Sequence, residues 1–326
     1  MQHRRPLALV IGATGSIGAA VAGALLTRGW RVRGLNRTIN RPDRAELAGI
    51  EWVTGDAMRR ADILVAAEGA KIIVHAANPP GYANWAKLQP GMIESAIAAA
   101  QATGARIVLP GNVYNYGPDA WASITETSPQ NPTTRKGAIR VAVEQRLEVA
   151  ASQGARTLVV RAGDFFGPYS GSSWLTEGWV AKGKRIQALT FPGPGPVPHT
   201  WAYLPDFAQS IVQLIEMEAE LPAFAVFNHG GHQLTGDQLA TTLERVAGRK
   251  LARKTMPWFV MGVVSPFVEM LREMMEMRYL WDHALMLDNS KLVATLGAEP
   301  HTPLDDALRA ALEGHGCLEP VARLAA

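Results

Sequence analysis

Residues 7–18 read LALVIGATGSIG, and this stretch decides the fold. It opens with five apolar residues, as a buried strand does, and Gly12, Gly15 and Gly18 follow at regular spacing. The pattern of Ser16–Arg28 then indicates a helix. In such a turn one glycine makes the bend, one lets the backbone approach a pyrophosphate, and one lets helix and strand pack closely. The N–H groups and positive dipole end of the helix favour phosphate, so the stretch predicts a dinucleotide site.

Composition limits the other classes of function. The chain has 326 residues, 48% hydrophobic and 19% charged, with a net charge of +3 from scattered basic residues. We therefore expect no nucleic-acid partner. The apolar run near the N-terminus is too short for a signal peptide, and no stretch is apolar enough to span a membrane, so no membrane partner is expected. Cys317 is the only cysteine, which excludes a disulfide framework and fits a reducing, cytoplasmic location.

Short apolar runs alternate with helical patterns through the first half of the chain. The runs are rich in Val, Ile and Leu without alternation, as expected when both faces of a sheet are covered. Strand–helix alternation predicts an α/β fold with a doubly wound parallel sheet, whose ligands bind beyond the carboxyl ends of the strands. The expected strands are Leu7–Ile11, Arg31–Leu35, Glu51–Thr54, Ile72–His75, Arg106–Leu109 and Thr157–Arg161. The expected helices are Ser16–Arg28, Ala61–Gly69, Trp85–Thr103 and Gly137–Gln153.

Several motifs occur in the order found in one large family. They are GATGSIG, Gly55-Asp56, His75-Ala76-Ala77, NVYNYG (112–117), RAGDFFGP (161–168), HTWAYLPDF (199–207) and Asn228-His-Gly-Gly231. With these motifs the chain resembles the extended short-chain dehydrogenase/reductase superfamily, the NAD(P)-dependent epimerase/dehydratase group, over nearly its whole length. The resemblance implies a Rossmann-type NAD(P)-binding domain, residues 1–165, which residues 199–230 re-enter. Residues 166–198 and 231–326 would form a smaller C-terminal substrate-binding lobe.

The resemblance also implies which residues contact the cofactor. They are Gly12, Thr14, Gly15, Ser16, Ile17, Gly18, Asn36, Arg37, Asp56, Ala57, Ala76, Ala77, Pro110 and Arg140. An acidic residue at the end of the second strand would bind the ribose 2′-hydroxyl and favour NAD. Here the strand ends Leu35-Asn36-Arg37, without a carboxylate. Because a guanidinium can hold a 2′-phosphate with paired hydrogen bonds, Arg37 favours NADP(H) over NAD(H).

The catalytic positions implied by the resemblance carry other residues. Members of the family use a Tyr-x-x-x-Lys pair and a Ser or Thr. With Glu144 as the anchor of the alignment, Lys136 stands at the Tyr position and Arg140 at the Lys position. Asn112 stands at the Ser/Thr position.

Two hypotheses follow from these changes. In the first, the protein is an oxidoreductase or epimerase-like enzyme with a rearranged site. Lys136, desolvated beside a cation, would donate the proton, Arg140 would bind the ribose and Asn112 would polarise a carbonyl; a phenol from Tyr114, Tyr116 or Tyr169 is the alternative donor. In the second, the protein is a non-catalytic NADP(H) sensor or regulatory protein, and Lys136 and Arg140 belong to a solvated basic helix face.

The substrate class depends on Asp164. It stands where the family has an asparagine near the diphosphate of nucleotide sugars. A carboxylate repels a diphosphate, so we expect a small carbonyl or hydroxyl compound, with nucleotide-sugar epimerase/dehydratase activity as a further alternative. Asp164 either pairs with Lys136 and takes part in the chemistry or caps backbone N–H groups.

Two further expectations concern metals and partners. His229 and His232 are three apart in a glycine-rich turn without nearby carboxylates, so we expect no metal site. The resemblance implies a possible homodimer through the helices Trp85–Thr103 and Gly137–Gln153.

Overall fold

The structure, a computed structural model, describes residues 5–38, 47–79, 84–171 and 173–318. Its centre is a seven-stranded sheet in which every neighbouring pair of strands is parallel. This sheet confirms the predicted α/β doubly wound fold. In spatial order the strands are β10 (Phe224–Asn228), β6 (Thr157–Arg161), β5 (Arg106–Gly111), β4 (Ala70–His75), β1 (Leu7–Ile11), β2 (Arg31–Asn36) and β3 (Glu51–Thr54).

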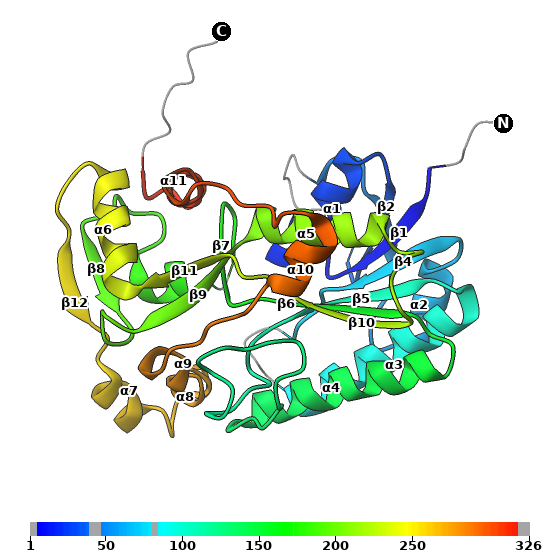
Figure 1. Cartoon of the computed structure of the whole chain (residues 1–326), viewed down its shortest axis with the longest axis horizontal. Coiled ribbons are helices and arrows are strands. Elements are labelled where there is room, and N and C mark those ends of the chain that lie inside the picture. The colour runs from blue at the N-terminus through cyan, green and yellow to red at the C-terminus, as the bar shows by residue number, and fades with distance from the viewer. Residues whose placement is uncertain (1–4, 39–46, 80–83, 172, 319–326) are drawn as a thin grey trace, which may run out of the picture.

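Helices cover both faces of this sheet (Figure 1). On one face α1 (Ser16–Thr27) packs against α5 (Leu204–Glu216). On the other, α3 (Trp85–Thr103) packs between α2 (Arg60–Ala66) and α4 (Arg135–Ser152). Each face buries its own apolar core, which explains the continuous apolar runs: all residues of β1, β5 and β6 are buried. The carboxyl ends of the strands thus meet at one edge, where a ligand can bind.

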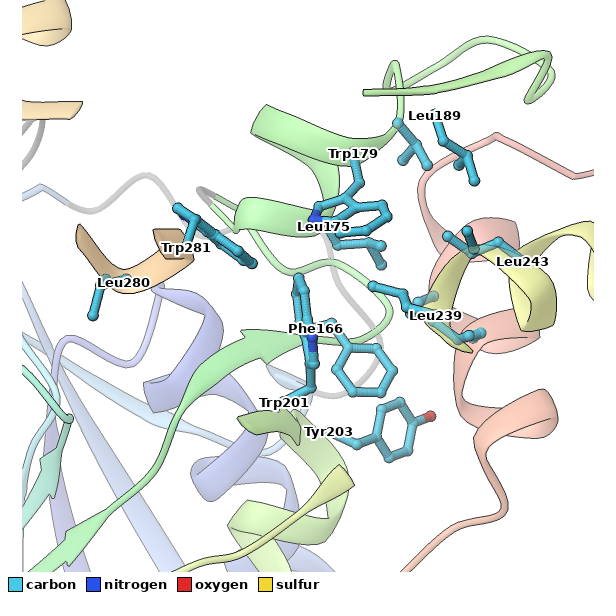
Figure 2. Close-up of a cluster of buried hydrophobic side chains, with 14 of the residues drawn as sticks. Phe166, Leu175, Trp179, Leu189, Trp201, Tyr203, Leu239, Leu243, Leu280 and Trp281 are labelled. Atoms are coloured by element: carbon cyan, nitrogen blue, oxygen red, sulfur yellow. The ribbon is translucent and has the colours of Figure 1, made fainter. Parts of the chain in front are cut away.

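The rest of the chain forms a smaller lobe beside that edge (Figure 1). A three-stranded sheet has the order β11 (His232–Thr235), β9 (Pro198–Tyr203), β7 (Asp164–Phe166), and β8 (Ala188–Phe191) pairs with β12 (Ala252–Thr255). The lobe helices are η3 (Leu175–Trp179), α6 (Gly236–Ala247), α7 (Trp258–Val264), α8 (Glu269–Glu276), α9 (Tyr279–Asp282) and α11 (Leu304–Gly314). Their core is rich in aromatic rings, with Phe166 in contact with both Trp201 and Tyr203 (Figure 2).

Two segments cross the boundaries expected from the sequence. Strand β9, which was expected in the NAD(P)-binding domain, pairs with β7 and β11 in the lobe. Residues 224–228, from the same expected stretch, add β10 to the large sheet. Helix α10 (Ser290–Leu296), expected in the lobe, packs on β10, and its Leu292 joins the core under α1 and α5. The proline–glycine loop 191–198 is packed against the lobe, since a Cβ at Gly193 would lie 2.3 Å from the carbonyl oxygen of Trp281.

The lobe also exposes apolar side chains. Phe259 on α7 and Phe267 just beyond it are 84% and 88% exposed, and α8 buries none of its residues. None of the helices within the described ranges is long and apolar enough to cross a membrane.

Candidate active site

The glycine turn has almost no room for side chains. Gly12 has a φ of +89°, and a Cβ there would lie 2.6 Å from the backbone nitrogen of Ala77. A Cβ on Gly18 would lie 2.2 Å from the carbonyl oxygen of Gly12. Gly12 therefore lets the turn pass the end of β4, and Gly18 lets α1 pack on the turn.

The N-terminus of α1 is suited to an anion. Its N-cap is Gly15, without a side-chain cap, and no acidic residue occupies its first turn. The unpaired N–H groups and the helix dipole therefore face the turn with no carboxylate competing. The Ser16 hydroxyl accepts a hydrogen bond of 2.6 Å from the N–H of Gly171, so the loop after β7 is docked on this turn.

A large cavity, which we call cavity A, opens beyond β1, β2 and β4. Its volume is about 520 Å³, within the range of small-molecule sites. Most residues expected to contact the cofactor line it: Gly12, Thr14, Gly15, Ser16, Ile17, Asn36, Arg37, Asp56, Ala57, Ala76 and Ala77. Gly18 lies beneath the turn instead, where it supports the turn by packing. The tight turn, the anion-ready helix end and the cavity together fit a dinucleotide.

At the far end of cavity A the polar groups follow the expected pattern. Asn36 ends β2 and Arg37 follows it, both lining the cavity. The Asp56 carboxylate accepts from the N–H of Met58 at 2.9 Å, which fixes the short turn after β3. Asp62 in turn accepts from the Asp56 N–H at 2.9 Å. The carboxylate of Asp56 is thereby held at the cavity wall.

A second cavity, cavity B, adjoins the first and has a volume of about 150 Å³. Ile17, Asn78, Phe165 and Ser173 line both cavities. Cavity B brings together four residues predicted from sequence, namely Pro110, Asn112, Arg140 and Asp164. Tyr114 and Trp174 line it as well. The two cavities thus lie side by side, with four wall residues in common, between the β2 end and the lobe.

Arg140 and Asn112 have defined surroundings in cavity B. Arg140 is buried, and its guanidinium lies 5.2 Å from the ring centroid of Trp85. Burial, with the charge of Arg140 adding to it, lowers the pKa of His75 at the end of β4 to about 4. The Asn112 side-chain oxygen accepts from the N–H of Tyr114 at 3.0 Å, so the amide N–H₂ is the group it offers to a ligand.

The structure gives Lys136 different surroundings from those expected. Its ammonium donates to Glu273 and to Glu276 Oε2, the latter at 2.9 Å, and Arg135 joins the same two carboxylates. Burial acts to raise the pKa of Glu276, but the hydrogen bonds from Lys136 lower it. The predicted role of Lys136 as proton donor required a cation beside its ammonium, whereas the groups that accept from this ammonium are the carboxylates of Glu273 and Glu276. The alternative prediction, that Lys136 and Arg140 belong to a solvated basic helix face, is also wrong, because both side chains are buried.

Asp164 has a partner that the sequence did not indicate. Its Oδ2 lies 2.5 Å from His199 Nε2, and both side chains are buried. The expectation that Asp164 pairs with Lys136 or caps backbone N–H groups is replaced by this hydrogen bond. Asp164 ends cavity B on the lobe side. His199 follows a proline in a loop-like stretch, and only the pairing of β7 with β9 brings it beside Asp164.

Tyr116 is excluded as the alternative phenol. Its hydroxyl accepts from Arg161 Nη1 at 2.6 Å, and Arg161 also donates to Glu144 at 2.6 Å. Burial raises the pKa of Tyr116 further above its usual value. Tyr169 is more than half exposed, which leaves Tyr114 as the phenol of the three that lines cavity B.

His229, the residue directly after β10, takes part in side-chain hydrogen bonding. His229 Nδ1 lies 3.1 Å from the Ser210 hydroxyl and 3.6 Å from Glu299, a carboxylate that the local sequence did not indicate. Across the residues that the structure describes, no group of three or more His, Cys, Asp or Glu side chains is arranged to hold a metal ion.

Comparisons with known proteins show the family and the fold of the chain. The sequence pattern of the NAD dependent epimerase/dehydratase family matches residues 8–230. A 3-diazoavenalumate denitrifying reductase from a Streptomyces species is 28% identical over 226 residues, which are 65% of this chain and 72% of that protein.

Solved structures show the same fold. UDP-glucose 4-epimerase from Brucella ovis in complex with NAD superimposes with a TM-score of 0.78 at 18% identity, covering 95% of this chain and 98% of that one. UDP-glucose-4-epimerase from Stenotrophomonas maltophila, with bound NAD and formylated UDP-arabinopyranose, gives a TM-score of 0.73 at 18% identity, covering 96% and 98%.

Proposed function

The chain belongs to the NAD-dependent epimerase/dehydratase family, and from this premise we propose that it is an NADP(H)-dependent oxidoreductase acting on a small carbonyl or hydroxyl compound. The observation that carries the proposal is that cavities A and B adjoin and share four wall residues. A dinucleotide in cavity A brings its nicotinamide end toward Asn112, Arg140 and Asp164, which line cavity B. The reductase from Streptomyces adds support, because its name gives the same class of reaction.

The preference for NADP(H) rests on the end of β2. Arg37 lines cavity A, and Asn36 stands where an NAD-specific site would have a carboxylate. A guanidinium binds the extra phosphate of NADP(H) with charge-assisted hydrogen bonds, whereas a carboxylate would repel it.

Two residues that line cavity B would bind the cofactor ribose and the substrate oxygen. A bound nicotinamide supplies the carbon that accepts or donates a hydride. Arg140 replaces the lysine that binds the ribose hydroxyls in the family, and its contact with Trp85 holds it at the cavity. The amide N–H₂ of Asn112 can donate to the substrate oxygen and stabilise negative charge there.

A small substrate is favoured over a nucleotide sugar. Cavity B, at about 150 Å³, is smaller than the 300 Å³ or more that typical ligand sites offer. Its wall carries the Asp164 carboxylate, which would repel a diphosphate.

Cofactor binding tests the first half of the proposal. Arg37→Gln should weaken NADPH binding about 10- to 100-fold, as expected for a lost charged hydrogen bond, and leave NADH binding nearly unchanged. Arg60→Gln is the matched control, because Arg60 is exposed at the start of α2 and lines neither cavity. Equal or tighter binding of NADH by the wild type would refute the NADP(H) preference.

Turnover tests the second half. NADPH oxidation is followed with a panel of small aldehydes and ketones, and NADP⁺ reduction with the matching alcohols. The proposal expects turnover with at least one compound. Because Lys136 is held by carboxylates instead of lining cavity B, a non-catalytic NADP(H) sensor is the second candidate. Thermal stabilisation by NADPH without turnover on the whole panel would favour the sensor.

A further inference from the structure

We propose that Asp164, oriented by His199, exchanges the proton with the substrate oxygen in cavity B. The inference rests on the proposed function and names the acid–base group that the altered family positions lack. Asp164 is the catalytic residue of this inference, because it lines the cavity, and His199 is a positioning residue behind it.

The geometry of the pair resembles an oriented base. His199 Nε2 lies 2.5 Å from Asp164 Oδ2, which is within hydrogen-bond distance, and both side chains are buried. The bond engages Oδ2 of the carboxylate, and Asp164 lines cavity B. A reacting group held by a second side chain in this way is the general arrangement of activated catalytic residues.

Close backbone packing and two aromatic rings restrain Asp164 and His199. Gly163 lets the chain pass β9 at close range, since a Cβ there would lie 2.0 Å from the carbonyl oxygen of Thr200. Trp281 stacks on His199 with ring centroids 4.3 Å apart and 26° between planes. Trp201 meets the same imidazole edge-on at 5.5 Å. Figure 2 shows Trp201 and Trp281 in the lobe core, so the imidazole is fixed by two large aromatic side chains.

Other ionisable groups surround Asp164 from every side. Arg140 lines cavity B on the α4 side. Tyr279 of α9 lies near enough that the charge of Asp164 adds to burial in raising the pKa of this tyrosine. Tyr279 is thereby kept protonated, and Asp164 is the carboxylate that lines this end of the cavity.

The proton balance of the step is complete. In the oxidation of an alcohol, the substrate O–H bond breaks and its proton passes to Asp164. The carbinol C–H bond breaks at the same time, and the hydride leaves with both electrons to the bound NADP⁺, so that a carbonyl forms. In reduction the hydride passes from NADPH to the carbonyl carbon, and the proton passes from Asp164 to the carbonyl oxygen. Each turnover moves one proton through Asp164, which exchanges it with solvent between cycles.

Asp164→Asn tests the role of the carboxylate. It keeps the shape of the side chain, and kcat should fall at least about 100-fold, as general acid–base catalysis supplies that much, while NADPH affinity stays within about threefold. In Asp164→Ala, added formate should restore turnover in a concentration-dependent way. Asp206→Asn is the matched control, since Asp206 is equally buried, accepts from Thr302, and lines neither cavity.

The pair also has a signature that needs no turnover. The imidazole N–H proton of His199 in so short a bond should give a far-downfield proton resonance in the protein without cofactor. This resonance should vanish in His199→Gln and shift upfield in Asp164→Asn. His199→Gln should lower kcat more than it changes KM, because it disturbs the orientation of Asp164 and leaves the cavity wall in place.

The outcomes separate this inference from the proposed function. Wild-type turnover that persists unchanged in Asp164→Asn overturns the role of Asp164 and leaves the oxidoreductase standing. Loss of turnover in Lys136→Met together with full turnover in Asp164→Asn assigns the proton to Lys136 instead. A wild type that binds NADPH but turns over nothing on the panel refutes the proposed function, and this inference with it.

Discussion

His75→Leu should make the protein less sensitive to acid. His75 ends β4, next to Ala76 and Ala77 of cavity A, and its ring is fully buried. Within the described part of the chain, neither ring nitrogen has a hydrogen-bond partner. Burial, reinforced by the charge of Arg140, lowers the pKa of His75 from 6.5 to about 4. The native state therefore requires the neutral imidazole.

The size of the effect follows from the two pKa values. A folded pKa below the unfolded one gives stability that is complete above pH 6.5 and is lost as the pH falls toward 4. Over the whole interval the loss is about 3 kcal/mol, because a pKa difference of one corresponds to about 1.4 kcal/mol. Protonation of His75 stabilises the unfolded state relative to the folded state by about 2 kcal/mol at pH 5 and by about 0.2 kcal/mol at pH 7.

The assay is urea unfolding of the wild type and His75→Leu at pH 7 and pH 5. The variant should lose about 2 kcal/mol less unfolding free energy between the two pH values. Val74→Ala on the same strand is the control. It removes buried volume without a titrating group, and its cost should be the same at both pH values. Equal pH dependence of the wild type and His75→Leu would refute the assignment of a neutral, buried His75.

Three further outcomes test the fold around the site. Gly18→Ala should lower the unfolding free energy by about 1–3 kcal/mol and weaken NADPH binding, because its Cβ would meet the Gly12 carbonyl at 2.2 Å; melting temperature and titration measure both. Arg161→Met should cost about 3–5 kcal/mol by leaving Glu144 buried without its partner, and adding Glu144→Leu should recover most of that loss in urea unfolding. Phe267→Ser should change the unfolding free energy by less than about 0.5 kcal/mol, because that ring is 88% exposed; a large fall in melting temperature would contradict the exposure.

Local sequence signals predicted the sheet and cavity A well. Strand, turn and helix are consecutive at the glycine run, so spacing alone predicted a tight turn there, and the structure shows which atoms crowd Gly12 and Gly18. Arg37 could likewise be placed because it directly follows a strand. The homodimer through α3 and α4 stays a prediction.

Pairs between distant residues could not be predicted from one sequence. The carboxylates that bind Lys136 lie 137 and 140 positions later, on a helix whose docking depends on the whole lobe. His199 reaches Asp164 only because β9 and β7 pair in parallel across 35 positions. Local patterns identify which side chains reach an edge of the sheet, whereas the partner of a buried charge is set by tertiary packing.

The surroundings of Lys136 and Arg140 on α4 explain why the proton would come from a different residue than in the family. Arg140 remains at cavity B, but Lys136, one turn earlier, binds Glu273 and Glu276 of α8. Because α8 belongs to the lobe, the position that resembles the family's tyrosine here joins the lobe to the sheet domain. Freeing its ammonium would leave these two partly buried carboxylates with Arg135 alone, whose side chain is 75% exposed, as their counter-charge. Lys136 is therefore engaged away from cavity B, and among the residues that line this cavity Asp164 is the buried carboxylate.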